Sequence, residues 1–241
     1  MWPLVGIPQS ILQGLTAYRS IFFREAGFVH VSRYVTGLLL SPYKTLQGIY
    51  SQWVFPEGEP VSRRAMHEAV FEAGWDREAL MVQHRRVVAQ RYQGQGRQVI
   101  GLDWTLAHHE RSNRIYGVKR SFDYVENRMS RYQTVMTAAV SNRQTVDGLA
   151  VEVQAPKYEA EEKAYLEMTT QDSYEEMAQV RERLVELLHY QKNRLVYRKR
   201  TEMAVDLVRQ IEAEGQFPQA HYAFDNGVLC RPLTELIEQS G

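Results

Sequence analysis

The chain has 241 residues, of which 44% are hydrophobic and 24% are charged, and its 29 basic side chains balance 29 acidic ones. This composition, with a mean hydropathy of −0.44, is typical of a globular protein and excludes a largely disordered chain. The single cysteine, Cys230, excludes an internal disulfide framework and a multi-cysteine metal site.

The first 96 residues predict a helical region. Apolar residues at helical spacing predict helices near residues 8–22 and 30–40. Side chains suited to N-caps then predict three more helices, which begin at Ser41 (through residue 53), Ser62 (through residue 71) and Asp76 (to about residue 92). Gly94 and Gly96 mark a domain boundary after residue 96.

The apolar period changes from 3.6 to 2 after this boundary, and strands are predicted at 98–103, 132–140, 146–154 and 221–225. The polar, arginine-rich segment 104–129 is predicted to be a long loop with a short strand at 114–118. Residues 159–214 and 232–238 are predicted to be helical. We therefore expect an α/β (α+β) chain, with a helical region at 1–96 and a mixed-sheet domain at 97–241.

Two predicted strands end on a carboxylate, at Asp103 and Asp225. If these strands are parallel neighbours, their ends lie about 4.8 Å apart. Carboxylate oxygens suit Mg²⁺ or Mn²⁺, and a pair of such ions can activate water for phosphodiester cleavage. The ordinary role of an aspartate at this position is to cap a turn or a helix, and the spacing alone does not decide between the two roles.

Several segments resemble bacterial insertion-sequence DDE transposases. Residues 101–140 resemble that family's first catalytic segment, which has a strand-end Asp-x-Thr, a basic loop with Gly-Val and a strand opening on Gln, here at Asp103, Thr105, Gly117, Val118 and Gln133. Further similar segments are 34–39 before the core, 199–204 at a helix start and 222–227 around the second aspartate. The order of three strands, helix, strand and helix is that of the RNase H-like fold.

The resemblance implies a metal-dependent endonuclease and strand transferase, with Asp103 and Asp225 as ligands of a two-metal site for Mg²⁺ or Mn²⁺. The family's third ligand, a Glu on a later helix, has no match, because Glu235 and Glu238 come too early. We therefore expect an incomplete RNase H-like core, truncated before the catalytic Glu, and whether such a chain acts as an enzyme stays open.

The resemblance also implies that DNA is the partner, both as insertion-sequence ends and as target. The helical region 1–96 would bind the DNA ends, and a homodimer in the synaptic complex is an arrangement that the family allows. The predicted DNA contacts are basic side chains in the loop after Asp103 and before a later helix, namely Arg111, Arg114, Lys119, Arg120, Arg128, Arg198, Lys199 and Arg200. Acidic neighbours leave open that these are solvated surface charges.

Charge is unevenly distributed: residues 1–97 carry 11 basic and 7 acidic side chains, whereas residues 156–214 carry 10 and 13. The excess of basic side chains in residues 1–97 permits an anionic partner without requiring one. The alternatives to a transposase are a catalytically inactive DNA-binding remnant and a soluble interaction domain with no nucleic-acid role.

The adjacent histidines His108 and His109 suggest a transition-metal site with Asp103 and His221. Because neighbouring side chains on a strand point to opposite faces, contact with phosphate is the favoured interpretation. No run of about 20 apolar residues and no signal-peptide pattern is present, so no membrane contact and a cytoplasmic location are expected.

Overall fold

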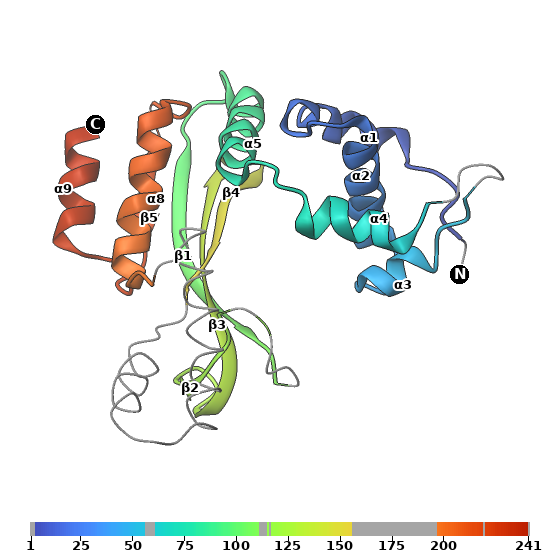
Figure 1. Ribbon diagram of the computed structural model, residues 1–241. Coiled ribbons are helices and arrows are strands. Elements are labelled where there is room, and N and C mark those ends of the chain that lie inside the picture. The colour runs from blue at the N-terminus through green and yellow to red at the C-terminus, as the bar shows by residue number, and fades with distance from the viewer. Residues whose placement is uncertain are drawn as a thin grey trace, which may run out of the picture. The chain divides into compact units, whose positions relative to one another are not determined.

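The computed structural model describes residues 3–55, 61–110, 115, 117–155, 197–218 and 220–240. The chain divides into two compact units, Met1–Arg91 and Tyr92–Gly241, which are coloured from blue to cyan and from green to red in Figure 1. Most of the predicted helical segment 159–214 lies outside the described residues, and its described part is helix α8, Arg200–Glu214.

The first unit is helical, as predicted. Its elements are α1 (Gln9–Thr16), the 3₁₀ turn η1 (Arg19–Ile21), α2 (Glu25–Leu40), α3 (Leu46–Tyr50), α4 (Arg63–His67), the π turn η2 (Glu68–Glu72) and α5 (Arg77–Tyr92).

Two of the three predicted N-caps are confirmed. The Ser62 hydroxyl accepts a hydrogen bond from the Ala65 amide at 3.0 Å, and the Asp76 carboxylate accepts one from the Glu78 amide at 2.9 Å. Each side chain satisfies an amide that the first helical turn leaves without a partner.

The predicted cap at Ser41 is wrong. The Ser41 amide donates to Gly37 O and ends α2, and its hydroxyl bonds the backbone of Tyr43. Because that hydroxyl is already engaged, α3 begins later, where the Thr45 hydroxyl accepts the Gly48 amide at 3.1 Å.

A close approach of two helices organises the first unit. Gly37 on α2 faces Ile49 on α3, which is fully buried in a cluster with Trp53 and Met66. A Cβ atom added at Gly37 would lie 2.1 Å from Ile49 Cγ2, so glycine is what lets the helices meet.

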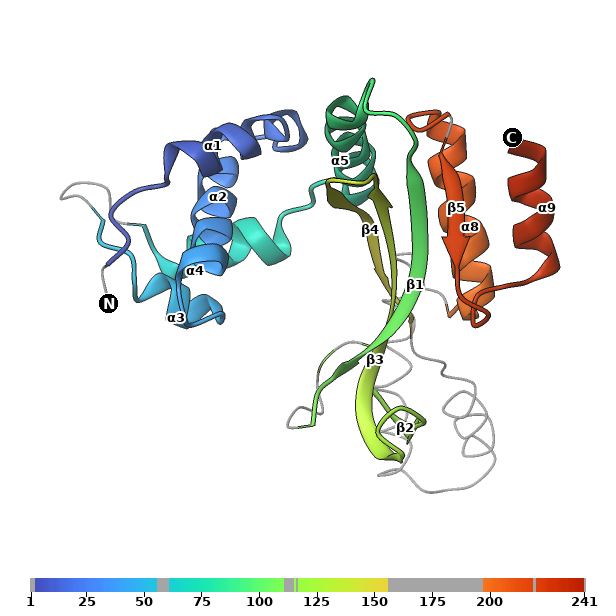
Figure 2. The ribbon, with the colours of Figure 1, turned by 180° about the vertical axis from the view of Figure 1, so that it is seen from behind.

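The second unit is built on a mixed sheet (Figure 2). Its strands are β1 (Val99–His108), β2 (Lys119–Asp123), β3 (Arg128–Ser141), β4 (Val146–Val153) and β5 (His221–Phe224). The strand order is β2-β3-β1-β5, and β4 pairs with β3 as well. Strand β1 is antiparallel to β3 and parallel to β5, so the expected mixed α/β architecture is present.

The predicted loop at 104–129 is wrong at residues 104–108, 119–123 and 128–129, which lie in strands. Strand β1 continues beyond Asp103 to His108, because Asp103–His108 pair with Tyr132–Thr137 of β3. Strand β3 begins at Arg128, and β2 pairs with its first part in a hairpin. The first residue of β2 is Lys119, so this strand lies beyond the one predicted at 114–118. Cross-strand pairing therefore extends strands that the polar sequence pattern did not reveal.

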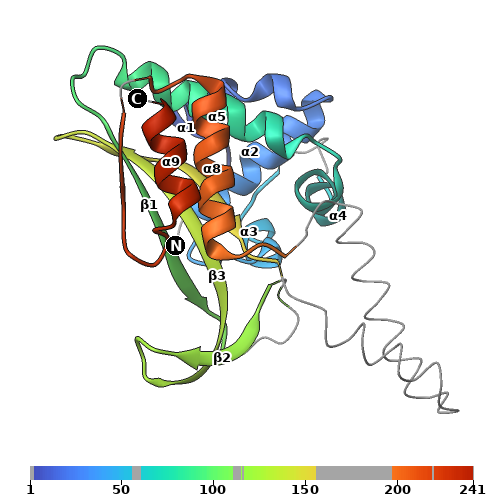
Figure 3. The same ribbon diagram turned by 90° about the vertical axis from the view of Figure 1, so that its left-hand side faces the viewer.

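Helix α8 covers one face of the sheet, and α9 (Arg231–Ser240) packs beside it (Figure 3). Buried side chains line both sides of this contact, including Ile100, Leu102, Met136, Ala138 and Val140 on the strands and Met203, Leu207, Val208 and Ile211 on α8. Because side chains alternate between faces, Gly101, Asp103 and Thr105 lie on the opposite face of β1.

Replacing Gly37 with Ala is expected to lower the free energy of unfolding by about 1–3 kcal/mol, because the buried Ile49 side chain cannot move aside. Gly27, on the same helix, has no atom within 4 Å of an added Cβ, so Gly27→Ala should be neutral or stabilise by up to about 1 kcal/mol. Urea denaturation followed by tryptophan fluorescence measures both. Equal effects of the two substitutions would contradict the close approach.

Candidate functional site

The pairing of β1 with β5 brings two aspartates to neighbouring positions. The parallel register runs from Val99 beside His221 to Leu102 beside Phe224. The next residue of each chain segment is an aspartate, Asp103 or Asp225, and both are exposed. Since paired strands lie about 4.8 Å apart, the backbone positions of these two aspartates are neighbours.

The two aspartates differ in their place on the strands. Asp225 directly follows β5, as predicted, whereas Asp103 lies inside β1 and not at its end. Beyond Phe224 no described residue pairs with the β5 side of β1. The strand edge beside Asp103 is therefore open within the described part of the chain.

Each carboxylate uses one oxygen in a local hydrogen bond. The Trp104 amide donates to Asp103 Oδ1 at 2.7 Å, and the Gly227 amide donates to Asp225 Oδ1 at 2.8 Å. Among the described residues nothing donates a hydrogen bond to either Oδ2 atom. Asp225 thus caps the turn after β5, whereas Asp103 lies within a strand and caps no turn. Each side chain keeps one oxygen for a cation.

Trp104 fixes the turn that carries Asp225. A Cβ atom added at Gly227 would lie 2.6 Å from Trp104 Nε1 and 3.1 Å from Asp225 Oδ1, so the turn lies against the indole. Trp104 Nε1 is buried and has no hydrogen-bond partner among the described residues. The guanidinium carbon of Arg200 lies 3.9 Å from the centre of the indole, a cation–π contact.

Of the predicted DNA contacts, Arg111 and Arg114 lie outside the described residues, and two others form ion pairs. Arg128 contacts Glu110 at 3.0 Å and Glu126 at 2.5 Å. Arg198 bridges two carboxylates, Glu152 on β4 at 2.6 Å and Asp206 on α8 at 2.9 Å. These two guanidinium groups hold parts of the fold together.

Four other predicted contacts have no acidic partner among the described residues. The Lys119 ammonium lies over the Tyr132 ring at 5.6 Å, and burial together with the charge of Arg200 lowers the pKa of Lys119. Arg120 and Lys199 are exposed, and Arg200 stacks on Trp104. Lys119 and Arg200 therefore concentrate positive charge near the strand that carries Asp103.

A second group of side chains could hold a metal ion. Ligand atoms of His108, Glu110 and Glu126 all lie within 4.8 Å of one another. The other histidines considered from the sequence lie elsewhere: His109 hydrogen-bonds Gln133 at 2.7 Å, and His221 pairs with the first residue of β1. The sequence did not reveal this group because Glu126 reaches His108 only through the β2–β3 hairpin.

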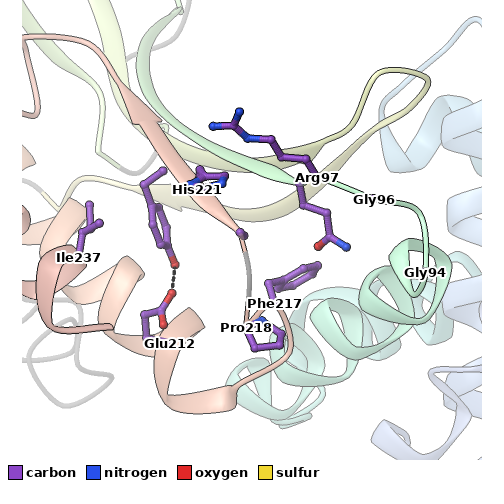
Figure 4. A pocket seen from close by; sticks show the side chains of 11 residues that line it. Gly94, Gly96, Arg97, Glu212, Phe217, Pro218, His221 and Ile237 are labelled. Atoms are coloured by element: carbon purple, nitrogen blue, oxygen red, sulfur yellow. Dashed lines mark hydrogen bonds between the residues drawn. The ribbon is translucent and has the colours of Figure 1, made fainter. Parts of the chain in front are cut away.

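A pocket of about 920 Å³ opens at the other end of the β1–β5 pair (Figure 4). Gln98 and His221 from the strand starts and Glu212 from α8 are among the residues that line it. The Tyr222 hydroxyl donates to Glu212 at 2.5 Å, and burial and this bond raise the pKa of Tyr222. The pocket is thus separate from the Asp103–Asp225 edge.

Comparisons of the chain with protein-family models, curated proteins and solved structures give no match. Among the described helices, none has the length and apolar character needed to cross a membrane. The functional interpretation therefore depends on the geometry of the two carboxylate groups and the basic residues around them.

The Trp104–Gly227 contact makes a direct prediction. Gly227→Ala should lower the free energy of unfolding by about 1–3 kcal/mol, and adding Trp104→Phe, which removes Nε1, should recover part of that loss. Urea denaturation of the two single variants and the double variant gives the coupling. Gly148→Ala is the matched control, because nothing lies within 4 Å of its added Cβ. Strictly additive effects would show that the two residues do not contact each other.

Proposed function

We propose that this chain is part of a DNA transposase of the bacterial insertion-sequence DDE type, and that Asp103 and Asp225 are its first two metal ligands. The observation that carries the proposal is the parallel register of β1 and β5, which sets the two aspartates next to each other on an open strand edge. The turn-capping role accounts for Asp225 but not for Asp103, which lies within β1.

The strand arrangement supports an RNase H-like core. Setting aside the short β2, the order β4-β3-β1-β5 has two antiparallel pairs followed by one parallel pair. Helix α8 precedes β5, and α9 follows it. This is the sequence of three strands, helix, strand and helix that the resemblance to the DDE family implies.

The residues at the strand edge fit a hard divalent cation such as Mg²⁺ or Mn²⁺. Asp103 and Asp225 are exposed, and among the described residues their Oδ2 atoms accept no hydrogen bond, so oxygen ligands are available. When bound there, the metal would supply the activation of water and charge stabilisation for cleavage of a phosphodiester. The protein's part is to hold both carboxylates in place, through the amides of Trp104 and Gly227.

The basic residues support DNA as the partner and can be divided by their contacts. Arg198 and Arg128 are held by carboxylates, so they contribute little net positive charge. Lys119, Arg120, Lys199 and Arg200 have no acidic partner among the described residues. We infer that this second set contacts the phosphate backbone beside the aspartates.

Metal binding tests the aspartate pair. In a His108→Gln background, which removes the imidazole of the second group, Mn²⁺ affinity measured by electron paramagnetic resonance should fall about tenfold or more on Asp103→Asn or Asp225→Asn. Glu238→Gln on α9 is the control, since Glu238 is exposed on another element. Unchanged Mn²⁺ affinity in both aspartate variants would rule out the shared site.

DNA binding tests the division of the cations. Arg200→Gln should weaken binding to duplex DNA and reduce the slope of log affinity against log salt by about 0.9. Arg198→Gln should leave that slope unchanged but lower thermal stability, because Glu152 and Asp206 lose their partner. The reverse pattern would contradict the assignment.

Nicking of supercoiled DNA separates the three functional classes. Mg²⁺-dependent nicking that is lost in Asp103→Asn indicates a nuclease. Salt-sensitive DNA binding without nicking indicates a catalytically inactive remnant of the same ancestry. Absence of DNA binding indicates an interaction domain and rejects the transposase proposal.

A further inference from the structure

A second polar group lies where the end of β1 meets the β2–β3 hairpin. It consists of His108, the last residue of β1, Asp123, the last residue of β2, Glu126 in the hairpin turn, and Glu110; these four residues are called the hairpin group. Along extended β1, about 16 Å separates His108 from Asp103, so the hairpin group is distinct from the aspartate pair.

The strongest observation concerns the buried Asp123. Its side chain is 0% exposed. Oδ1 accepts the amides of Val125 and Glu126, whereas Oδ2 has no hydrogen-bond partner among the described residues. A buried carboxylate needs a compensating positive charge, which either a protonated His108 or a metal ion bound by neutral His108 would supply. Oδ2 points toward the imidazole of His108, whose Nε2 lies 3.1 Å away.

One distance within the hairpin group matches that of two ligands around one ion, and the others are longer. His108 Nε2 lies 3.1 Å from Asp123 Oδ2 and 3.8 Å from Glu126 Oε1. Ligand atoms of His108, Glu110 and Glu126 lie within 4.8 Å of one another, a set that does not include Asp123. Two atoms bound about 2.1 Å from one metal lie roughly 3.0–3.4 Å apart. Metal binding therefore requires the exposed Glu110 and Glu126 side chains to move closer to His108.

Arg128 orients the group without occupying its centre. Its guanidinium binds Glu126 Oε2 and Glu110 Oε1, which leaves Glu126 Oε1 on the side of His108. Two carboxylates contact this single guanidinium, and Asp123 adds a third to the group, so negative charge remains for a further cation. Hydrogen bonds that hold ligand carboxylates in this way are typical around metal sites.

We propose that His108, Asp123 and Glu126, with Glu110 as a fourth ligand, bind a divalent transition metal that fastens the β2–β3 hairpin to the end of β1. One imidazole nitrogen with carboxylate oxygens suits Zn²⁺, whereas Mg²⁺ and Ca²⁺ prefer oxygen ligands alone. Zn²⁺ is also bound more tightly than Mn²⁺ by such ligands. The ion has a structural role, because it bridges the end of β1, the end of β2 and the β2–β3 turn.

Zinc titration of the full chain tests the site. In an Asp103→Asn, Asp225→Asn background with excess Mg²⁺, isothermal titration calorimetry should give about one zinc per chain. His108→Gln and Glu126→Gln should each weaken binding about tenfold or more. His109→Gln is the matched control, because His109 is the neighbouring residue but hydrogen-bonds Gln133 and should leave zinc affinity unchanged.

The Glu126→Gln variant keeps the test independent of folding, because that side chain is 39% exposed, whereas Asp123→Asn alters a buried turn. Circular dichroism confirms that the variants compared are folded. Replacement of zinc by Co²⁺ should give visible d–d absorption that His108→Gln removes. Absence of zinc binding in the starting background, equal loss in His109→Gln, or unchanged affinity in both His108→Gln and Glu126→Gln would each overturn the proposal.

Discussion

The antiparallel pairing of β1 with β3 is the constraint on which the second unit depends. Strand β3 is 14 residues long, and its register with β1 extends from Ser141 beside Val99 to Tyr132 beside His108. Because β1 is held along its whole length, β5 can pair with its first part and the hairpin can meet its last residue. The same register therefore sets the position of Asp103 in the aspartate pair and the position of His108 in the hairpin group.

Packing of α8 on the sheet determines which basic side chains are neutralised by acidic neighbours and which keep their positive charge. Burial of α8 against the strands places Arg198 between Glu152 and Asp206, and it sets Arg200 on the indole of Trp104. The first guanidinium is neutralised by its neighbours, and the second retains its charge near Asp103. Neighbouring residues of one basic segment thus differ, because of packing, in whether their charge is available to an anionic partner.

The sequence by itself determined the local features of this protein. Hydrogen bonds within a few residues depend on side-chain chemistry and short spacing, so the caps at Ser62 and Asp76 were predictable. The spacing of apolar residues predicted the helical region at residues 1–96, the strands and the position of Asp225 after the last strand. The cap at Ser41 failed because its hydroxyl serves Tyr43, a local competition that composition does not reveal.

Only the tertiary structure decided how distant segments meet. The extension of β1 beyond Asp103 comes from pairing with β3, because the polar residues involved carry no strong strand pattern of their own. Likewise, His108 meets Asp123 and Glu126 only once the hairpin register is fixed. A sequence shows which residues can bind a metal or a phosphate, whereas strand register determines which of them lie within reach of one ion.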